Sequence, residues 1–148
     1  MTFKVFLMGG IGNQLFQITR AKSIQLEGQK VILLKLGRLK KIVYSLIGHP
    51  QHEDWLNIIE ISKSLNIEIR NSNFYELIQL FYSYFLKKIS SLKDFDIPLQ
   101  DRLKSKKKLD IGYFQDTYHS HQKAQDALIV ALRKTLMIGE TKTYQKKI

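Results

Sequence analysis

The amino-acid sequence predicts an α/β fold in which a Rossmann-like parallel sheet is flanked by helices. Three observations support this prediction: two short apolar runs near the amino terminus, a stretch of helical spacing between them, and glycines at both junctions. A strand, a crossover helix and a second strand form a βαβ unit, whose strands are parallel and whose crossover is right-handed. The 148 residues are enough for one ordinary domain, and we expect a single Rossmann-like domain over residues 1–148.

The first part of the chain justifies the βαβ unit element by element. Residues 3–8 (FKVFLM) are an apolar run bounded by glycines, which is typical of a buried strand. Over residues 14–27 the apolar side chains mostly recur at helical spacing, and Gly28 follows as glycines do at helix ends. Residues 30–34 (KVILL) predict the second buried strand.

The middle of the chain is less regular. A basic loop at residues 37–41 precedes an apolar run at residues 42–47, and Asp54 is placed to cap a helix that begins at residue 55. Residues 67–70 (IEIR) predict a short strand.

Residues 74–89 (FYELIQLFYSYFLKKI) form a strongly apolar helix pattern with six aromatic side chains. Its two polar interruptions, Glu76 and Gln79, lie three residues apart and leave only a narrow stripe for water. We expect this helix to be buried in the core or in a face between domains. A contact with a membrane surface or with another copy of the chain is the alternative.

The last third of the chain predicts a loop, a strand and a helix. The loop covers residues 94–109 and contains the basic run KSKKK, which we expect to be solvated, with contact to an anionic surface as the alternative. Residues 109–114 (LDIGYF) predict a strand, and residues 122–136 predict a helix that ends near Gly139. The tail after that glycine has no packing pattern.

Composition and charge narrow the classes of function. The net charge of +11 favours an anionic partner: nucleic acid, a phosphorylated small molecule or an anionic membrane. Lysine supplies 19 of the 24 cationic side chains, whereas base-specific readout of nucleic acid relies mainly on arginine. The absence of cysteine excludes disulfides and thiolate catalysis. No signal peptide or membrane-spanning segment is predicted, and we expect a cytoplasmic protein.

The stretch GGIGNQLFQ joins the first predicted strand to the first helix. Gly9, Gly10 and Gly12 let the backbone turn tightly and approach a ligand, and the first N–H groups of a helix favour phosphate or another anion. The dinucleotide fingerprint GxGxxG is incomplete because Leu15 replaces its third glycine. Lys35 stands where a ribose-binding acid is expected, which argues against NAD and leaves an NADP-type site open. The Walker-type phosphate loop is absent.

Asn13 and Gln14 place two side-chain amides at the start of this helix. Amides both donate and accept hydrogen bonds, which suits sugar hydroxyls and diphosphates better than it suits a hydride cofactor. The structural alternative is that Asn13 caps the helix through its side-chain oxygen.

Two segments of the chain resemble one known family. MGGIGNQLFQ at residues 8–17 resembles the amino-terminal signature of the bacterial α-1,2-fucosyltransferases, glycosyltransferase family 11, and LDIGYFQD at residues 109–116 is similar to that family's GYFQ segment. The resemblance implies the amino-terminal domain of a two-domain GT-B-like fold. It also implies inverting transfer of fucose from GDP-fucose to a galactose 2-hydroxyl of a surface glycan, with no metal and no cofactor beyond the donor substrate.

The HxRRxD motif of that family, whose arginines hold the leaving diphosphate, has no counterpart in this sequence. We therefore expect the chain to be the amino-terminal portion of such an enzyme, without the donor-binding domain and silent or nearly silent alone. The residues expected to form its part of the substrate cleft are Gly9, Gly10, Gly12, Asn13 and Gln14.

No general base is assigned from the sequence. Asp110 and Asp116 are candidates by their position beside the GYFQ segment, whereas His119 and His121 are expected to be surface residues and not metal ligands. A basic, non-enzymatic binding module for nucleic acid or an anionic surface is the alternative of a different class. By analogy with the family, the basic charge and the aromatic helix at residues 74–89 are also compatible with a peripheral site on the inner face of the cell membrane, where lipid-linked glycans would be the acceptors.

Overall fold

The computed structural model describes residues 2–37, 40–47, 57–89, 97–106, 109–112, 114–115 and 120–145. These residues form a four-stranded, all-parallel sheet with the strand order β3-β2-β1-β4. The strands are β1 (Thr2–Phe6), β2 (Lys30–Lys35), β3 (Glu68–Asn71) and β4 (Leu109–Asp110). The sheet and its flanking helices confirm the predicted α/β class and are consistent with a Rossmann-like fold.

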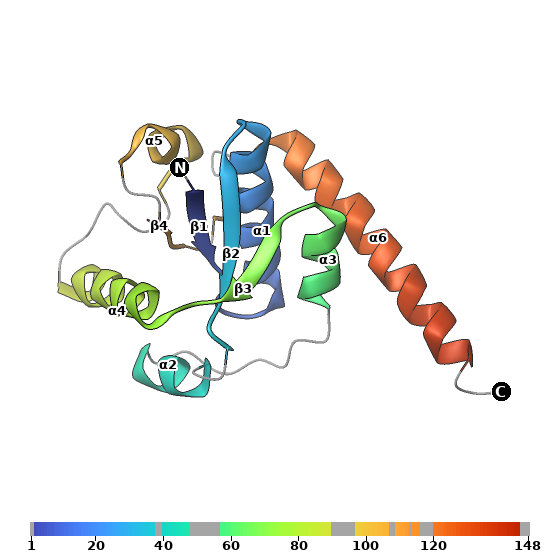
Figure 1. Ribbon diagram of the computed structural model, residues 1–148, viewed down its shortest axis with the longest axis horizontal. Helices are drawn as coiled ribbons and strands as arrows, with labels where there is room; N and C mark the ends of the chain where they lie inside the picture. Colours follow the sequence, from blue (N-terminus) through green and yellow to red (C-terminus); the bar gives the residue numbers. More distant parts are fainter. Residues whose placement is uncertain are drawn as a thin grey trace.

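Helices cover both faces of the sheet (Figure 1). One hydrophobic core includes side chains from α1 (Ile11–Leu26), α3 (Ile58–Ser64), α5 (Leu99–Lys104) and α6 (Gln122–Gln145). A second core, on the other face, includes side chains from α2 (Lys40–Ile47) and α4 (Phe74–Ile89). Parallel sheets are stable mainly when both faces are covered in this way.

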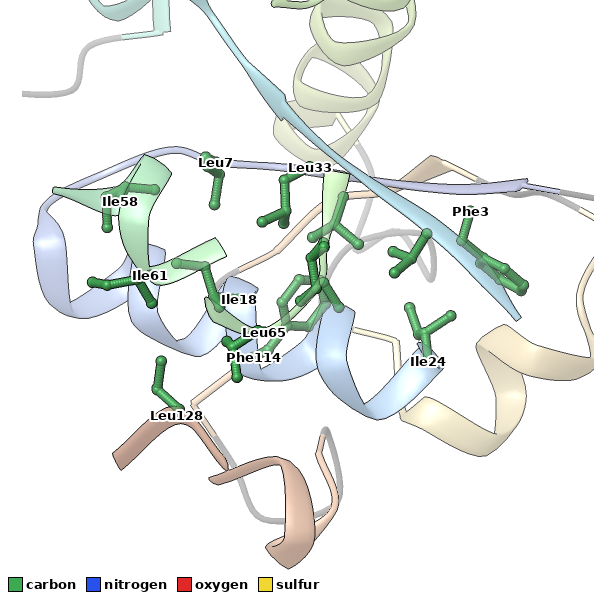
Figure 2. Close-up of a cluster of buried hydrophobic side chains, with 14 of the residues drawn as sticks. Phe3, Leu7, Ile18, Ile24, Leu33, Ile58, Ile61, Leu65, Phe114 and Leu128 are labelled. Carbon is green, nitrogen blue, oxygen red and sulfur yellow. The ribbon is translucent and has the colours of Figure 1, made fainter. Parts of the chain in front are cut away.

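Alternate residues of the central strands enter the two cores. In β1, Phe3 and Val5 enter the core beneath α1, whereas Phe6 enters the core beneath α4. Leu7 and Met8 continue this alternation beyond the strand. Figure 2 shows the first core, in which Phe3 and Leu7 lie among side chains from α1, α3 and α6. The run FKVFLM is apolar except for Lys4, because successive strand residues point to opposite faces that are both covered by helices.

The predicted βαβ unit is confirmed, with its boundaries shifted by a few residues. α1 begins at Ile11, three residues before the predicted start, because the chain becomes helical directly after Gly10, the N-cap residue. Gly28 follows α1 with a φ of 75°, a left-handed conformation that glycine adopts at helix ends without strain.

The third helix and the fourth strand differ in detail from the prediction. α3 is capped by Asn57, whose side chain accepts a hydrogen bond from the N–H of Glu60. Asp54, the predicted cap, lies outside the described residues. The strand predicted over residues 109–114 is limited to Leu109–Asp110.

Two predictions for the last third of the chain were wrong. The predicted loop over residues 94–109 contains α5, a short helix held in place by Arg102, whose buried guanidinium pairs with Asp110. This tertiary contact has no local signature in the sequence. The last helix does not end near Gly139 but continues to Gln145.

α4 occupies its predicted range, but the side that was predicted to face water, marked by Glu76, is buried. Glu76 is fully buried, and its Oε1 lies 2.6 Å from Arg70 Nη2 and 2.7 Å from Lys4 Nζ. Two cations from neighbouring strands compensate the buried carboxylate. Phe74 and Tyr75, by contrast, are exposed, so the prediction of burial in the core holds for one face of α4 only. No helix in the described ranges is long and apolar enough to cross a bilayer.

Candidate functional site

The carboxyl edge of the sheet brings together the segments that the sequence singled out. From β1 the strand order runs through β2 to β3 on one side, whereas β4 joins the other side of β1. The order therefore reverses between β1 and β4. Ligands of open α/β sheets bind outside the carboxyl ends of the strands at such a switch point.

The loop between β1 and α1 is held in one conformation by its own hydrogen bonds. Gly9 has a φ of 77°, which favours glycine. Its N–H donates to Tyr44 Oη at 3.0 Å, and its carbonyl accepts from Gln14 Nε2 at 3.0 Å. Gln14, predicted to contact a ligand, is only 5% exposed and supports the loop from within.

The first turn of α1 has the features of an anion-binding site. Gly10 is its N-cap residue, and no side chain caps the helix. The N–H groups of a first turn have no acceptor within their own helix, and the helix dipole adds partial positive charge there. Gly12 is exposed, and a Cβ added to it would meet no atom beyond its own helix turn within 4 Å. Packing therefore does not require glycine at position 12, whereas close approach of a ligand would.

Asn13 does not cap α1, so the structural alternative considered for it was wrong. It lies inside the first turn, and its Oδ1 accepts a hydrogen bond from Gln115 Nε2 at 2.9 Å. Asn13 is partly exposed and Gln115 is exposed. The two amides therefore stand as a pair at the surface of the switch point.

Gln17 was not predicted as a site residue, yet it joins the ends of β1 and β4. Its Oε1 accepts from the N–H of Met8 at 2.8 Å, and its Nε2 donates to the carbonyls of Met8 at 3.2 Å and Gly112 at 2.8 Å. The side chain is fully buried. Buried amides require partners, but the sequence did not single out Gln17, because α1 buries several other polar side chains as well.

Asp110, a candidate general base by position, points into the interior. Its Oδ2 accepts from Arg20 Nε at 2.7 Å, and its Oδ1 accepts from Arg102 Nε at 3.0 Å. All three side chains are at most 1% exposed. Arg20 also lies over the ring of Phe114, 4.9 Å from the centroid. A carboxylate enclosed in this way is out of reach of a substrate, which contradicts the role of general base.

Of the other titratable candidates, only His121 is described, and it does not join the site. His121 is near the far end of α1, where its Nε2 lies 2.5 Å from Glu27 Oε1. Asp116 and His119 lie outside the described residues. In the part of the chain that the structure describes, no group of three or more histidine, aspartate or glutamate residues could hold a metal ion.

A cavity of about 500 Å³ lies beside the glycine loop, at the carboxyl ends of β1 and β2. This volume is typical of small-molecule sites. The lining residues come from both strand ends, from α1 and α2, and from the start of α3: Leu7, Gln14, Lys35, Leu36, Gly37, Lys40, Tyr44, Asn57, Ile58 and Ile59. Of the five residues predicted to form the substrate cleft, Gln14 alone is among them.

Among the described residues, the lining of the cavity is basic, because it includes Lys35 and Lys40 and no acidic side chain. Lys35 ends β2, at the position where a dinucleotide-binding domain has the carboxylate that holds a ribose. Lys40 Nζ lies 5.8 Å from the ring centroid of Tyr44, the residue that also binds Gly9. The cavity and the first turn of α1 therefore offer positive potential on the same edge of the sheet.

Comparison of the chain with models of protein families, with curated proteins and with solved structures found no match.

Proposed function

We propose that residues 1–148 form one wall of the cleft of an inverting fucosyltransferase with a GT-B-like fold. The enzyme would transfer fucose from GDP-fucose to the 2-hydroxyl of a galactose in a surface glycan. One observation supports this most directly: the two segments that resemble the family are hydrogen-bonded to each other, through Asn13 to Gln115 and through Gln17 to Gly112. They meet at the switch point, where α/β domains bind their ligands.

The electrostatics of this edge suit a nucleoside diphosphate. The first turn of α1 presents backbone N–H groups and the positive end of the helix dipole. Lys35 and Lys40 add two cationic side chains in the adjoining cavity, whose described lining residues include no acidic side chain. A diphosphate at the glycine loop would therefore be attracted by both features.

The amide pair suits a sugar. In the observed orientation, Gln115 donates to Asn13, which leaves the pair with one amide NH₂ group on Asn13 and one carbonyl oxygen on Gln115 for further bonding. Neighbouring hydroxyls of a pyranose both donate and accept, so a sugar can bond to both members of the pair.

Inverting transfer also needs proton removal from the acceptor hydroxyl and stabilisation of the leaving diphosphate. The resemblance assigns the second task to an HxRRxD segment, and the 148 residues contain neither that segment nor two adjacent arginines. We therefore expect these residues to bind the ligand without turnover when no other domain is present.

Titration of the chain with GDP-fucose, followed by amide-resolved NMR, tests the proposal. We expect weak but saturable shifts at Gly10, Gly12, Asn13 and Lys35, because the domain expected to hold most of the donor is not among these residues, and no fucosylated product when a β-galactoside is added. Asn13→Ala should weaken binding roughly fivefold, since one net hydrogen bond is worth about 1 kcal/mol. Gln100→Ala, which removes an exposed amide on α5, is the matched control and should not change binding.

Two other ligands distinguish the alternative functions. Saturable shifts with NADPH and none with GDP-fucose would assign an NADP-type site and overturn the proposal. A salt-dependent gel shift with duplex DNA, again without GDP-fucose binding, would assign a basic nucleic-acid module. Robust fucosyl transfer by the 148-residue chain would contradict the assignment of the leaving-group function to absent residues.

A further inference from the structure

α4 exposes an apolar face that runs along the helix. Phe74, Tyr75, Ile78, Tyr82 and Phe85 are between 48% and 77% exposed. Most of these positions are three or four residues apart, so they lie on one side of an α-helix. Exposed apolar surface of this extent on a helix marks a binding surface more often than chance exposure.

The opposite side of α4 holds the helix on the domain. Leu77 and Leu80 are buried in the second core, and Glu76 is ion-paired with Arg70 and Lys4. Glu76 also accepts from the N–H of Asn73, while Asn73 Oδ1 accepts from the N–H of Glu76. This reciprocal capping box fixes the start of the helix. The apolar face is therefore presented to the outside by a firmly anchored element.

The layer that contains this face is basic. α2 packs in the same core as α4, and its outer side exposes Lys41 and Ile42. Among the described side chains of α2 and α4, Lys41 is exposed and Lys40 is partly exposed, whereas the one acidic residue, Glu76, is buried and ion-paired. The layer thus joins exposed aromatic and aliphatic side chains to positive charge.

An anionic bilayer surface matches this combination better than a second copy of the chain does. A symmetric contact through α2 and α4 would bring the same lysines together across a two-fold axis, in a chain of net charge +11. Anionic lipid headgroups attract lysine, and aromatic and aliphatic side chains of an amphipathic helix enter the boundary beneath them. α4 has 16 residues and does not qualify as a spanning helix, so it would lie in the plane of the surface.

We propose that the outer face of α4, together with Lys41 and Ile42 of α2, docks the domain on an anionic membrane surface. This inference does not depend on the proposed transferase function, since it rests on the exposed side chains of α4, Lys41 and Ile42 and not on the glycine loop.

Co-sedimentation with lipid vesicles tests the proposal. We expect the chain to bind vesicles in which about a third of the phosphatidylcholine is replaced by phosphatidylglycerol, and to bind phosphatidylcholine alone far more weakly. The double variant Ile78→Gln, Phe85→Gln should lower the partition coefficient about tenfold or more, because it removes two apolar side chains from the boundary. Lys41→Gln should lower it about fivefold, and binding should fall as salt rises.

The matched control is Val130→Gln, Met137→Gln. These residues are 66% and 69% exposed on α6, which packs on the other face of the sheet. This variant should bind vesicles as the unaltered chain does. Failure of the unaltered chain to bind anionic vesicles would overturn the proposal. An equal loss of vesicle binding in the two double variants would also overturn it. A dimer of the unaltered chain in sedimentation, dissociated by the Ile78→Gln, Phe85→Gln variant, would overturn it in favour of contact between two copies.

Discussion

Asn13 and Gln115, 102 residues apart in the chain, share a hydrogen bond of 2.9 Å at the edge of the sheet. Because both side chains are accessible to solvent, the net contribution of this bond to stability is expected to be at most about 1 kcal/mol. The pair is therefore better suited to exchange a partner with a ligand than to hold the fold together.

A double-mutant cycle tests whether the two amides act as one unit. Asn13→Ala and Gln115→Ala should each weaken GDP-fucose binding, with little change in Tm. The double variant should lose little more than either single variant, because removal of one amide already disrupts the pair. Additive losses in calorimetric titrations, or a fall in Tm without loss of binding, would contradict joint recognition.

Replacement of Gly12 separates a ligand role from a structural one. An added Cβ meets nothing nearby in the described structure, and alanine favours helix more than glycine does. Gly12→Ala should thus keep or raise the free energy of unfolding, by up to about 1 kcal/mol, while it weakens GDP-fucose binding. Gly28→Ala is the control: at a φ of 75° it should destabilise the fold and leave binding unchanged. A Gly12→Ala variant that loses stability but binds GDP-fucose unchanged would refute the ligand role of Gly12.

Gln17→Leu should destabilise the domain by about 2–4 kcal/mol, because it leaves three buried backbone groups of Met8 and Gly112 without their side-chain partner. Urea denaturation measures this change. Gln100→Leu, at an exposed position of α5, should change the free energy of unfolding by less than about 0.5 kcal/mol. A Gln17→Leu variant of unchanged stability would show that the segments around Met8 and Gly112 are held together without the Gln17 amide.

Asp110→Asn should be among the most damaging single substitutions, because the buried side chains of Arg20 and Arg102 would both lose the charge of the Asp110 carboxylate. Removal of one partner from a buried ion pair costs about 3–5 kcal/mol. Thermal unfolding provides the measurement, and Asp101→Asn, an exposed acid on α5, provides the control. A folded Asp110→Asn variant of unchanged stability would reopen the possibility of a chemical role.

Glu76 gives the domain a predictable response to acid. The hydrogen bonds from Arg70, followed by those from Lys4 and the Asn73 N–H, lower the pKa of Glu76 from 4.5 to about 2. A carboxylate with a depressed folded-state pKa contributes stability that is present above the unfolded-state pKa and is lost as pH falls toward the folded-state value. The urea midpoint should therefore fall between about pH 5 and pH 2, and Glu76→Gln should flatten this part of the profile. An unchanged slope in that variant would refute the assignment.

The fold was predictable where one local pattern decided it. The βαβ unit followed from apolar runs and glycines, because strands buried on both faces and helix ends at left-handed glycines leave strong signatures. α5 was missed because its position depends on the contact of Arg102 with Asp110, which no local spacing reveals. The buried side of α4 was misassigned for a similar reason: Glu76 is polar in sequence but is neutralised by Arg70 and Lys4 from two other strands.

The candidate site was predictable in its location and less so in its roles. Glycines between a strand and a helix mark the carboxyl edge of a sheet, and the structure places them there. The sequence did not show which polar residues support the loop from within and which lie at the surface. Gln14 and Gln17 turn inward to hold the loop, whereas Asn13 turns outward to Gln115, and only the packing of α1 distinguishes these neighbouring amides.

The bond from Gln17 to Gly112, which spans 95 residues, also sets a constraint on how the chain folds. Of the four described strands, β4 is synthesised last but pairs with β1, which is synthesised first. Until it arrives, the turn that begins α1 lacks one of its supports, and the buried arginine of that helix lacks its carboxylate. Pairing of strands so far apart in the sequence is slow, because the chain between them loses conformational entropy before stabilising contacts form. The binding edge should therefore mature last on the folding pathway, and a nascent chain that has not yet released β4 from the ribosome should already hold β1, β2 and β3 but not the site.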